Sequence, residues 1–253
     1  MVDATDQPPV AADAQVQAIQ AELADLGTAE RATNEKRYLR SNLYHYGVTV
    51  PQLRKISKRI ARGCGDHDEL MASVSTLWAV PTHETRFLAA ALLGDRKQLL
   101  NVSDYPQLEE MLRGANTWAL VDTIVPHPVG TLSTQAPTES TPVLDSWSTD
   151  SNFWLRRSAL LAHLVPLTAG QGDWARFTRY ADLMLPETEF FVRKAIGWVL
   201  RDTSRKRPEL VRDWVAPRTQ LMSGVTIREA VRRLPEGEQQ ELMQAYREHR
   251  PAR

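Results

Sequence analysis

The chain has 253 residues, of which 42% are hydrophobic and 25% charged, and 31 Lys and Arg balance 31 Asp and Glu. This length and composition are typical of a globular protein with a sizeable core, and they exclude an intrinsically disordered chain. No run approaches the roughly 18 apolar residues of a membrane-spanning helix, so we expect no membrane association. The single cysteine, Cys64, can form no intrachain disulfide, and the N-terminal residues do not resemble a signal peptide. We therefore expect a cytoplasmic protein.

The beginning of the chain is acidic. The first 30 residues contain six acidic side chains and no Lys or Arg, which leaves a net charge of +6 on the rest. Residues 1–14 also lack large apolar side chains apart from valines and the first Met, so we predict a disordered acidic tail there. We expect the fold to begin near Gln15 and to form one HEAT-like repeat domain over residues 15–253.

A basic segment follows the tail. Between Arg31 and Arg62, nine cationic side chains stand against Glu35 alone. Such a concentration of charge suits a polyanionic partner such as a nucleic acid. The alternative is a set of cations that solvate the outer faces of helices, which is common for a charge run.

The remaining chain has the periodicity of an all-α protein. Apolar residues recur at spacings of three and four, and Gly and Pro clusters separate the expected helices. One position recurs every 35 or 36 residues along the chain, and a small residue follows it by two positions in most copies. Small residues at such positions allow neighbouring helices to pack closely. This weak repeat, 35 or 36 residues long, predicts a HEAT-like helical-repeat solenoid with a concave groove for an extended partner. Its column is Phe87, Asp122, Arg157, Arg193 and Arg228, and the small residues are Ala89, Ala159, Ala195 and Ala230.

Two segments of this repeat combine aromatic and cationic side chains. From Phe190 to Arg201, aliphatic residues (Val192, Ala195, Ile196 and Val199) occupy one helix face, whereas Trp198 and Arg201 share the other with Phe190, Phe191 and Lys194. We interpret that second face as open, with an aromatic plane beside a phosphate-binding guanidinium. The second segment is Phe153-Trp-Leu-Arg-Arg157. There Arg157 lies among apolar residues on the helical wheel, so its guanidinium needs a partner, which is either a protein carboxylate or a bound group. The alternative is an Arg157 that packs along its stem against the neighbouring repeat.

One segment combines an aromatic residue with an acid. Asp122 follows Trp118 by one helical turn, so the carboxylate and the indole share a face. A carboxylate in these apolar surroundings requires a partner, and an ion pair with Arg157 or another cation is the alternative to a functional role. Motifs for nucleotide binding and for zinc proteases are absent, and the six histidines lack ligand spacing. We therefore expect neither a metal nor another cofactor.

Five groups of segments carry a resemblance to a known family. They are Arg37-Tyr-Leu-Arg40 with Tyr46-Gly-Val48, Glu84-Thr-Arg-Phe87, Thr117-Trp-Ala-Leu-Val-Asp122, Phe153-Trp-Leu-Arg-Arg157 and Phe190-Phe-Val-Arg-Lys-Ala-Ile-Gly-Trp-Val-Leu-Arg201. In order and spacing these segments resemble the AlkD-like DNA alkylation repair family, which are DNA glycosylases built from HEAT-like repeats. The resemblance extends from about Arg31 to Arg233.

The resemblance implies binding of double-stranded DNA in the concave groove. It also implies hydrolytic release of N3- or N7-alkylated purines, in base excision repair of alkylation damage. We expect the protein to be a monomer. The family's catalytic aspartate falls on Asp122, its two groove tryptophans on Trp118 and Trp198, and its phosphate-contacting arginines on Arg157 and Arg201. Two departures from the family pattern are Ala119, where an acid is common, and Asp202-Thr203, where an acidic-aromatic pair is usual.

The chemistry is compatible with a single carboxylate. A purine alkylated at N3 or N7 is already cationic and leaves without protonation, so one Asp suffices to stabilise the sugar cation and to orient water. Flanking tryptophans add cation–π stabilisation. Some relatives bind branched DNA with little or no glycosylase activity, so the alternative function is a non-catalytic HEAT-like binder of branched or damaged DNA. A protein scaffold is a third hypothesis, which the cations and aromatics on one helix face disfavour.

Overall fold

The computed structural model describes residues 13–248, so the predicted tail lies outside the described residues except for its last two positions. Asp13 caps the first helix by accepting hydrogen bonds from the N–H groups of Gln15 and Val16. Within the described residues every regular element is a helix, apart from an isolated bridge between Tyr44 and Thr82. This confirms the all-α, helical-repeat prediction. None of the described helices combines the length and the apolar character that crossing a membrane requires.

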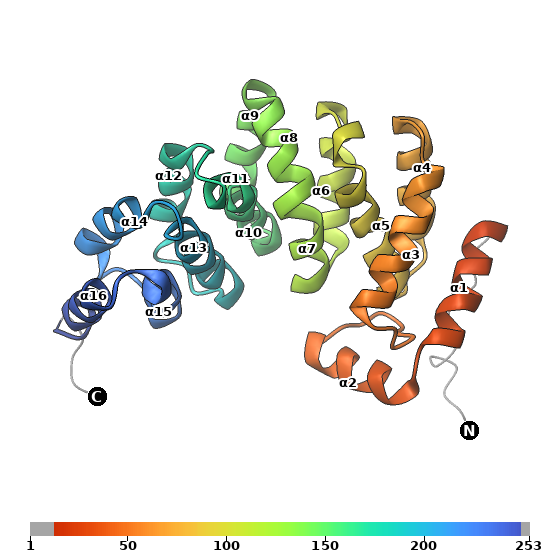
Figure 1. Cartoon of the computed structure of the whole chain (residues 1–253), viewed down its shortest axis with the longest axis horizontal. Coiled ribbons are helices and arrows are strands. Elements are labelled where there is room, and N and C mark those ends of the chain that lie inside the picture. The colour runs from red at the N-terminus through yellow and green to blue at the C-terminus, as the bar shows by residue number, and fades with distance from the viewer. Residues whose placement is uncertain (1–12, 249–253) are drawn as a thin grey trace. The chain divides into compact units, whose positions relative to one another are not determined.

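The chain forms two compact units, with the boundary in sequence between Ile124 and Val125. The labels and colours of Figure 1 follow the helices of each unit in chain order. The prediction of one domain over residues 15–253 stays a prediction. The first unit contains α1 (Ala14–Leu26), α2 (Ala29–Leu39), α3 (Val50–Gly63), α4 (His67–Ala79), α5 (His83–Asp95), α6 (Tyr105–Gly114) and α7 (Trp118–Ile124).

The second unit begins with a π-helical turn, η3 (Val125–Val129). Its α-helices are α8 (Gly130–Gln135), α9 (Pro137–Ser148), α10 (Phe153–Leu161), α11 (Leu164–Thr168), α12 (Trp174–Met184), α13 (Phe190–Thr203), α14 (Pro208–Val215), α15 (Gly224–Ala230) and α16 (Glu236–Glu248).

The sequence repeat corresponds to a structural repeat. Its five column residues lie at the fifth position of α5, α7, α10 and α15 and at the fourth position of α13. The small residues two positions later are all fully buried. In the first unit α5 packs against α7, and in the second unit α13 packs against both α10 and α15. The repeat therefore places equivalent helices in contact within each unit.

Close packing between α13 and α15 depends on a glycine. A Cβ at Gly197 would stand 2.8 Å from the Thr226 carbonyl oxygen, so a larger residue would push the two helices apart. The Thr226 hydroxyl also donates a hydrogen bond of 3.1 Å to the Arg193 carbonyl oxygen. These contacts fix α13, the helix that carries Trp198 and Arg201.

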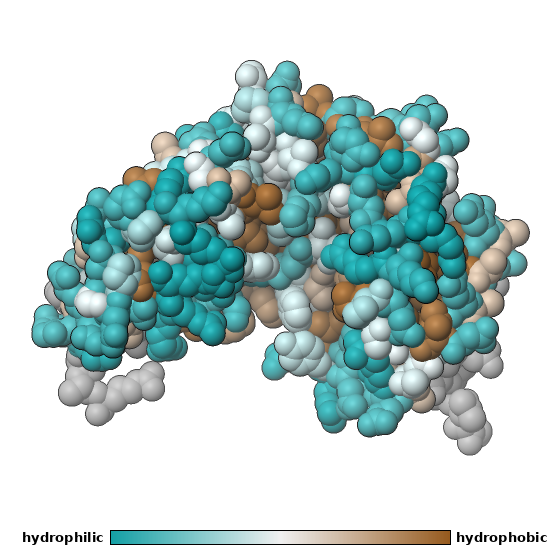
Figure 2. Space-filling model, in the orientation of Figure 1, coloured by the Kyte–Doolittle hydropathy of each residue, from teal (hydrophilic) through white to brown (hydrophobic). Residues whose placement is uncertain are grey.

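The two faces of α13 differ as the sequence predicts. Val192, Ala195, Ile196 and Val199 are fully buried, whereas Phe190 is 50% exposed. Lys194 is exposed, and Phe191, Trp198 and Arg201 are half-buried. Figure 2 shows hydrophilic side chains over most of the visible surface, with scattered hydrophobic patches between them. The second face of α13 therefore combines accessible aromatic and cationic side chains.

Candidate functional site

An aromatic pair joins α2 to α7 in the first unit. Trp118 is the first residue of α7 and is half-buried. The Tyr38 side chain on α2 is 73% exposed, and its ring lies edge-on to the indole with 5.9 Å between ring centres. Tyr38 is not among the site residues predicted from sequence. Its position between Arg37 and Arg40 is the signal that could have identified it, because an aromatic side chain flanked by cations suits a nucleic-acid surface.

Asp122 lies on the same face of α7 as Trp118, one turn later, and is half-buried. This helix is short, and the π-helical turn η3 follows it directly. Pro126 and Pro128 in that turn have no N–H, so the regular α-helical hydrogen-bond pattern cannot continue through them. π-Helical turns are frequent at functional sites, which makes the end of α7 a candidate for one.

Two residues adjoining this aromatic pair have left-handed backbone conformations. Arg40 (φ 50°) ends α2 two residues after Tyr38, and Asn116 (φ 51°) lies two residues before Trp118. In the part of the chain that the structure describes, these are the non-glycine residues with positive φ. Such conformations cost about 1–3 kcal/mol each and cluster at functional sites. These conformations determine how the chain leaves α2 and how it approaches α7, the two helices that carry the aromatic pair.

The segment Glu84-Thr-Arg-Phe87 on α5 positions both sides of this pair. The buried Glu84 carboxylate accepts hydrogen bonds from the N–H groups of Gly47 (2.7 Å) and Val48 (3.3 Å), beyond α2. Arg86 donates to the carbonyl oxygen of Gly114 (3.0 Å), just before α7. Gly47 has φ +81°, and a Cβ there would stand 2.2 Å from a backbone oxygen, so only glycine fits. This family-like segment thus acts as a support for α2 and α7.

Arg157 is almost completely buried in the second unit, with 2% of its surface exposed. Its Nη1 donates to the Phe191 carbonyl oxygen, and its guanidinium carbon lies 5.9 Å from the ring centres of both Phe191 and Trp198. Of the two sequence interpretations, this position matches the one in which Arg157 packs against the next repeat. A direct phosphate contact, which the family resemblance implies, would require the side chain to leave this position.

Trp198 and Arg201 both contact Asp202. The Trp198 indole N–H donates to Asp202 Oδ2 (2.9 Å), and Arg201 Nε donates to Asp202 Oδ1 (2.9 Å). Arg201 also pairs with Glu229. Burial opposes ionisation of Asp202, but the hydrogen bonds from Arg201 and Trp198 outweigh it and lower its pKa. Asp202 thus orients the indole, and the carboxylates of Asp202 and Glu229 both bind Arg201.

Two further arginines surround Asp202. Nε of Arg205 lies 3.9 Å and Nε of Arg233 lies 3.8 Å from Asp202 Oδ1, and their side chains are 51% and 39% exposed. Neither was predicted from sequence. Arg205 follows Arg201 by one helical turn, and this spacing is the signal that could have identified it. Both are more accessible to a polyanion than Arg157 or Arg201.

The basic segment exposes most of its cations on α2 and α3. Arg31 pairs with Glu35, and Arg59 pairs with Glu22.

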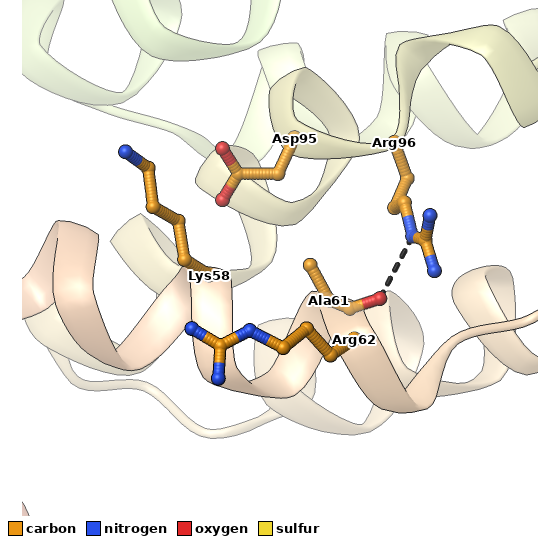
Figure 3. A pocket seen from close by; sticks show the side chains of 5 residues that line it. All are labelled: Lys58, Ala61, Arg62, Asp95 and Arg96. Atoms are coloured by element: carbon orange, nitrogen blue, oxygen red, sulfur yellow. Dashed lines mark hydrogen bonds between the residues drawn. The ribbon is translucent and has the colours of Figure 1, made fainter.

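A pocket of about 370 Å³ between α3 and the end of α5 is drawn in Figure 3. Arg96 at its edge donates to the Ala61 carbonyl oxygen (2.7 Å), so one of its cations is already used by the protein. The pocket is lined by Lys58, Ala61, Arg62, Asp95 and Arg96 and contains none of the aromatic residues described above.

A family model described as DNA alkylation repair enzyme matches residues 19–234. The chain belongs to this family. The match includes Tyr38, Trp118, Asp122, Trp198 and Arg233. The role of this DNA alkylation repair protein is therefore in the repair of alkylated DNA, and DNA is the partner that this role implies. No curated protein sequence gives a significant match.

Two solved structures resemble this DNA alkylation repair protein in fold. A protein of Enterococcus faecalis described as a predicted DNA alkylation repair enzyme has a TM-score of 0.72 and 21% identity, over 83% of this chain and 97% of that one. The protein smu.31 of Streptococcus mutans UA159 has a TM-score of 0.51 and 16% identity, over 87% of this chain and 98% of that one. At these identities the likeness is one of fold.

Proposed function

We propose that the protein is a DNA glycosylase that hydrolyses the N-glycosidic bond of N3- or N7-alkylated purines in double-stranded DNA. The observation that carries this proposal is the half-buried carboxylate of Asp122 on the same face of α7 as Trp118, whose ring meets the exposed ring of Tyr38. A member of a DNA alkylation repair family has a use for an acid beside an aromatic surface. A protein that only binds phosphates does not, because the acid repels them.

The reaction needs one carboxylate. When the bond between C1′ of the sugar and the alkylated nitrogen breaks, its electron pair stays with the purine and neutralises the cationic base. The sugar is left as an oxocarbenium ion, which the negative charge of Asp122 stabilises. Water then adds to C1′ and releases one proton to the solvent. Atoms and charges balance with water as the co-reactant, so the proposed reaction requires no metal or other cofactor.

The aromatic side chains have a complementary role. The faces of Trp118 and Trp198 stabilise a cation on the sugar or the base through their π electrons. Tyr38 holds the Trp118 ring by its edge contact, and Arg157 lies over the Trp198 ring. We therefore assign Trp118 and Trp198 to substrate binding and Arg157 to the orientation of Trp198.

Phosphate contacts come from the exposed cations. In the first unit these are Lys36, Arg37 and Arg40 on and next to α2. In the second unit Arg201 contributes together with the more exposed Arg205 and Arg233. Such contacts supply affinity without reading the base sequence.

Non-catalytic binding of branched or damaged DNA is the second candidate function. It is favoured by the departures from the family pattern at Ala119 and Thr203. Both candidates predict salt-dependent DNA binding, so binding alone does not separate them.

Release of the free base separates the two functions. Duplex oligonucleotides with one 7-methylguanine are incubated with excess protein, and free base and abasic sites are quantified against an undamaged duplex. A glycosylase produces equal amounts of both products from the damaged duplex alone. Salt-dependent binding without either product would overturn the glycosylase proposal and support the binding function.

A further inference from the structure

A cluster of metal-ligand groups lies in the first unit, beside α2. It consists of Glu35 on α2, His45 between α2 and α3, and His83 at the start of α5, and one ligand atom of each lies within 4.8 Å of the others. His45 and His83 are 5% and 3% exposed. They are 38 residues apart in sequence, so no ligand spacing indicated this site.

Several buried polar atoms of this cluster lack hydrogen-bond partners. Among the described side chains, buried atoms without a partner include Glu35 Oε2, both ring nitrogens of His45 and Nδ1 of His83. Glu35 Oε2 and His45 Nδ1 face each other at 3.5 Å, which is too long for a strong hydrogen bond. Buried polar atoms are nearly always satisfied in folded proteins, so several unpartnered atoms in one place indicate a missing ligand.

The surroundings keep the Glu35 carboxylate available. Arg31 donates to its other oxygen, Oε1, at 3.2 Å and so turns Oε2 toward the histidines. Ligating carboxylates are commonly held by such a hydrogen bond from outside the metal shell. The two imidazole rings are stacked, with 4.6 Å between centres and 6° between planes. One ring must rotate for both nitrogens to point at a single ion.

We propose that Glu35, His45 and His83 bind a divalent transition-metal ion, and that Zn²⁺ is the ion whose ligand preferences match this set. Two imidazoles and one carboxylate are common donors to Zn²⁺, with water as a fourth ligand. Glu84 offers a further carboxylate next to His83, and its Oε2 is also buried without a partner. This inference departs from the expectation that the protein needs no metal, and it is independent of the proposed glycosylase activity.

The ion would fasten α2 to the rest of the first unit. Leu39 is the single buried residue of α2, so apolar burial holds this helix weakly. Glu35 belongs to α2, whereas His83 belongs to the well-buried α5. A metal that binds both therefore steadies the helix that presents Tyr38 to Trp118.

Zinc binding by the full chain tests the site. The protein is stripped with a chelator, dialysed and titrated with Zn²⁺ by calorimetry, and Co²⁺ is then added as a spectroscopic substitute. We expect one ion per chain and a Co²⁺ absorption spectrum of low coordination number. Glu35→Gln, His45→Gln and His83→Gln should each weaken Zn²⁺ binding by at least about 10-fold.

His67→Gln is the matched control. His67 lies in the same unit and contacts two carboxylates, Asp68 and Asp104, so it is the alternative place for an adventitious ion. Its removal should leave the Zn²⁺ affinity unchanged. No stoichiometric binding by the wild type, or loss of binding in His67→Gln with retention in Glu35→Gln, would overturn the proposal.

A measurement on the wild type alone covers the case in which the histidine variants do not fold. Long-range ¹H–¹⁵N spectra resolve the histidine side chains, and Zn²⁺ should shift two buried imidazoles while the exposed ones stay unchanged. Amide exchange in α2 should slow at the same time. Shifts confined to exposed histidines, with unchanged exchange in α2, would refute the site.

Discussion

The ring of Tyr38 meets the indole of Trp118 edge-on, with 5.9 Å between ring centres and 89° between ring planes. This contact links α2 to the helix that carries Asp122. Because Tyr38 is 73% exposed, the pair presents an aromatic surface to solvent in a region rich in cations.

Two substitutions of Tyr38 distinguish the contribution of its aromatic ring from that of its hydroxyl group. Tyr38→Ala removes the edge contact, so we expect slower release of 7-methylguanine with a stability loss of only about 0.5–1.5 kcal/mol. Tyr38→Phe keeps the ring and should retain most of the activity. Single-turnover release and thermal melting of both variants check this. Equal rates for Tyr38→Ala and the wild type would remove Tyr38 from the site.

Asp122→Asn tests the catalytic carboxylate. The amide keeps the size of the side chain but removes the charge that would stabilise the sugar cation, so excision should fall on the order of 10²-fold or more. DNA binding should hold or improve, since a negative charge near phosphates is removed. Base release and duplex binding are measured together. Asp68→Asn, at a fully exposed carboxylate of the same unit, serves as the control and should match the wild type.

Arg157→Ala distinguishes support of Trp198 from phosphate contact. The guanidinium is buried and bonded to the Phe191 carbonyl oxygen, so its loss should destabilise the protein by about 2 kcal/mol or more. The slope of log affinity against log salt should not change. If Arg157 instead contacts a phosphate, the slope falls by about 0.9 and stability changes little. Urea unfolding and binding titrations at several salt concentrations decide between these outcomes.

Exposed cations should set the salt dependence of binding. Lys36→Gln on α2 and Arg205→Gln after α13 should each reduce the salt slope by about 0.9 for duplex DNA, because each removes one phosphate contact. Arg113→Gln is the control, since Arg113 is a half-exposed arginine already paired with Glu109. A slope that responds equally to all three changes would show a general charge effect and not a defined interface.

His163 should make stability depend on pH. It is 4% exposed among Phe177 and Tyr180, and burial lowers its pKa to about 4 from 6.5. The unfolded chain therefore binds a proton that the folded protein does not, and the stability present above pH about 6.5 is lost as the pH falls toward 4. Between pH 7 and pH 5 this loss is about 2 kcal/mol.

A comparison of variants isolates the contribution of His163 to the pH dependence of stability. His163→Gln cannot ionise, so its free energy of unfolding should fall less than that of the wild type between pH 7 and pH 5. His67 has a pKa raised by its hydrogen bonds to Asp68 and Asp104, so His67→Gln should increase the fall. Urea unfolding at both pH values gives these differences. Identical losses in the wild type and His163→Gln would contradict the assignment.

Local periodicity was sufficient to identify the helices and the faces they bury. The apolar face of α13 and the repeat column through Asp122 and Arg193 were both predicted, because a helix places residues three and four apart side by side whatever its surroundings. Trp118 and Trp198 were likewise placed outside the buried core, where the structure has them half-buried. These features depend on the order of residues within one helix.

Contacts between distant segments were decided by the tertiary structure. Tyr38 and Trp118 are 80 residues apart in sequence, and Arg157 and Trp198 are 41 apart, so no spacing within one helix relates them. The burial of Arg157 follows from the packing of α13 against α10, which supplies the carbonyl oxygen and the rings that enclose the guanidinium. Which side chains a helix meets depends on how its neighbours pack, and helical periodicity carries no information about that.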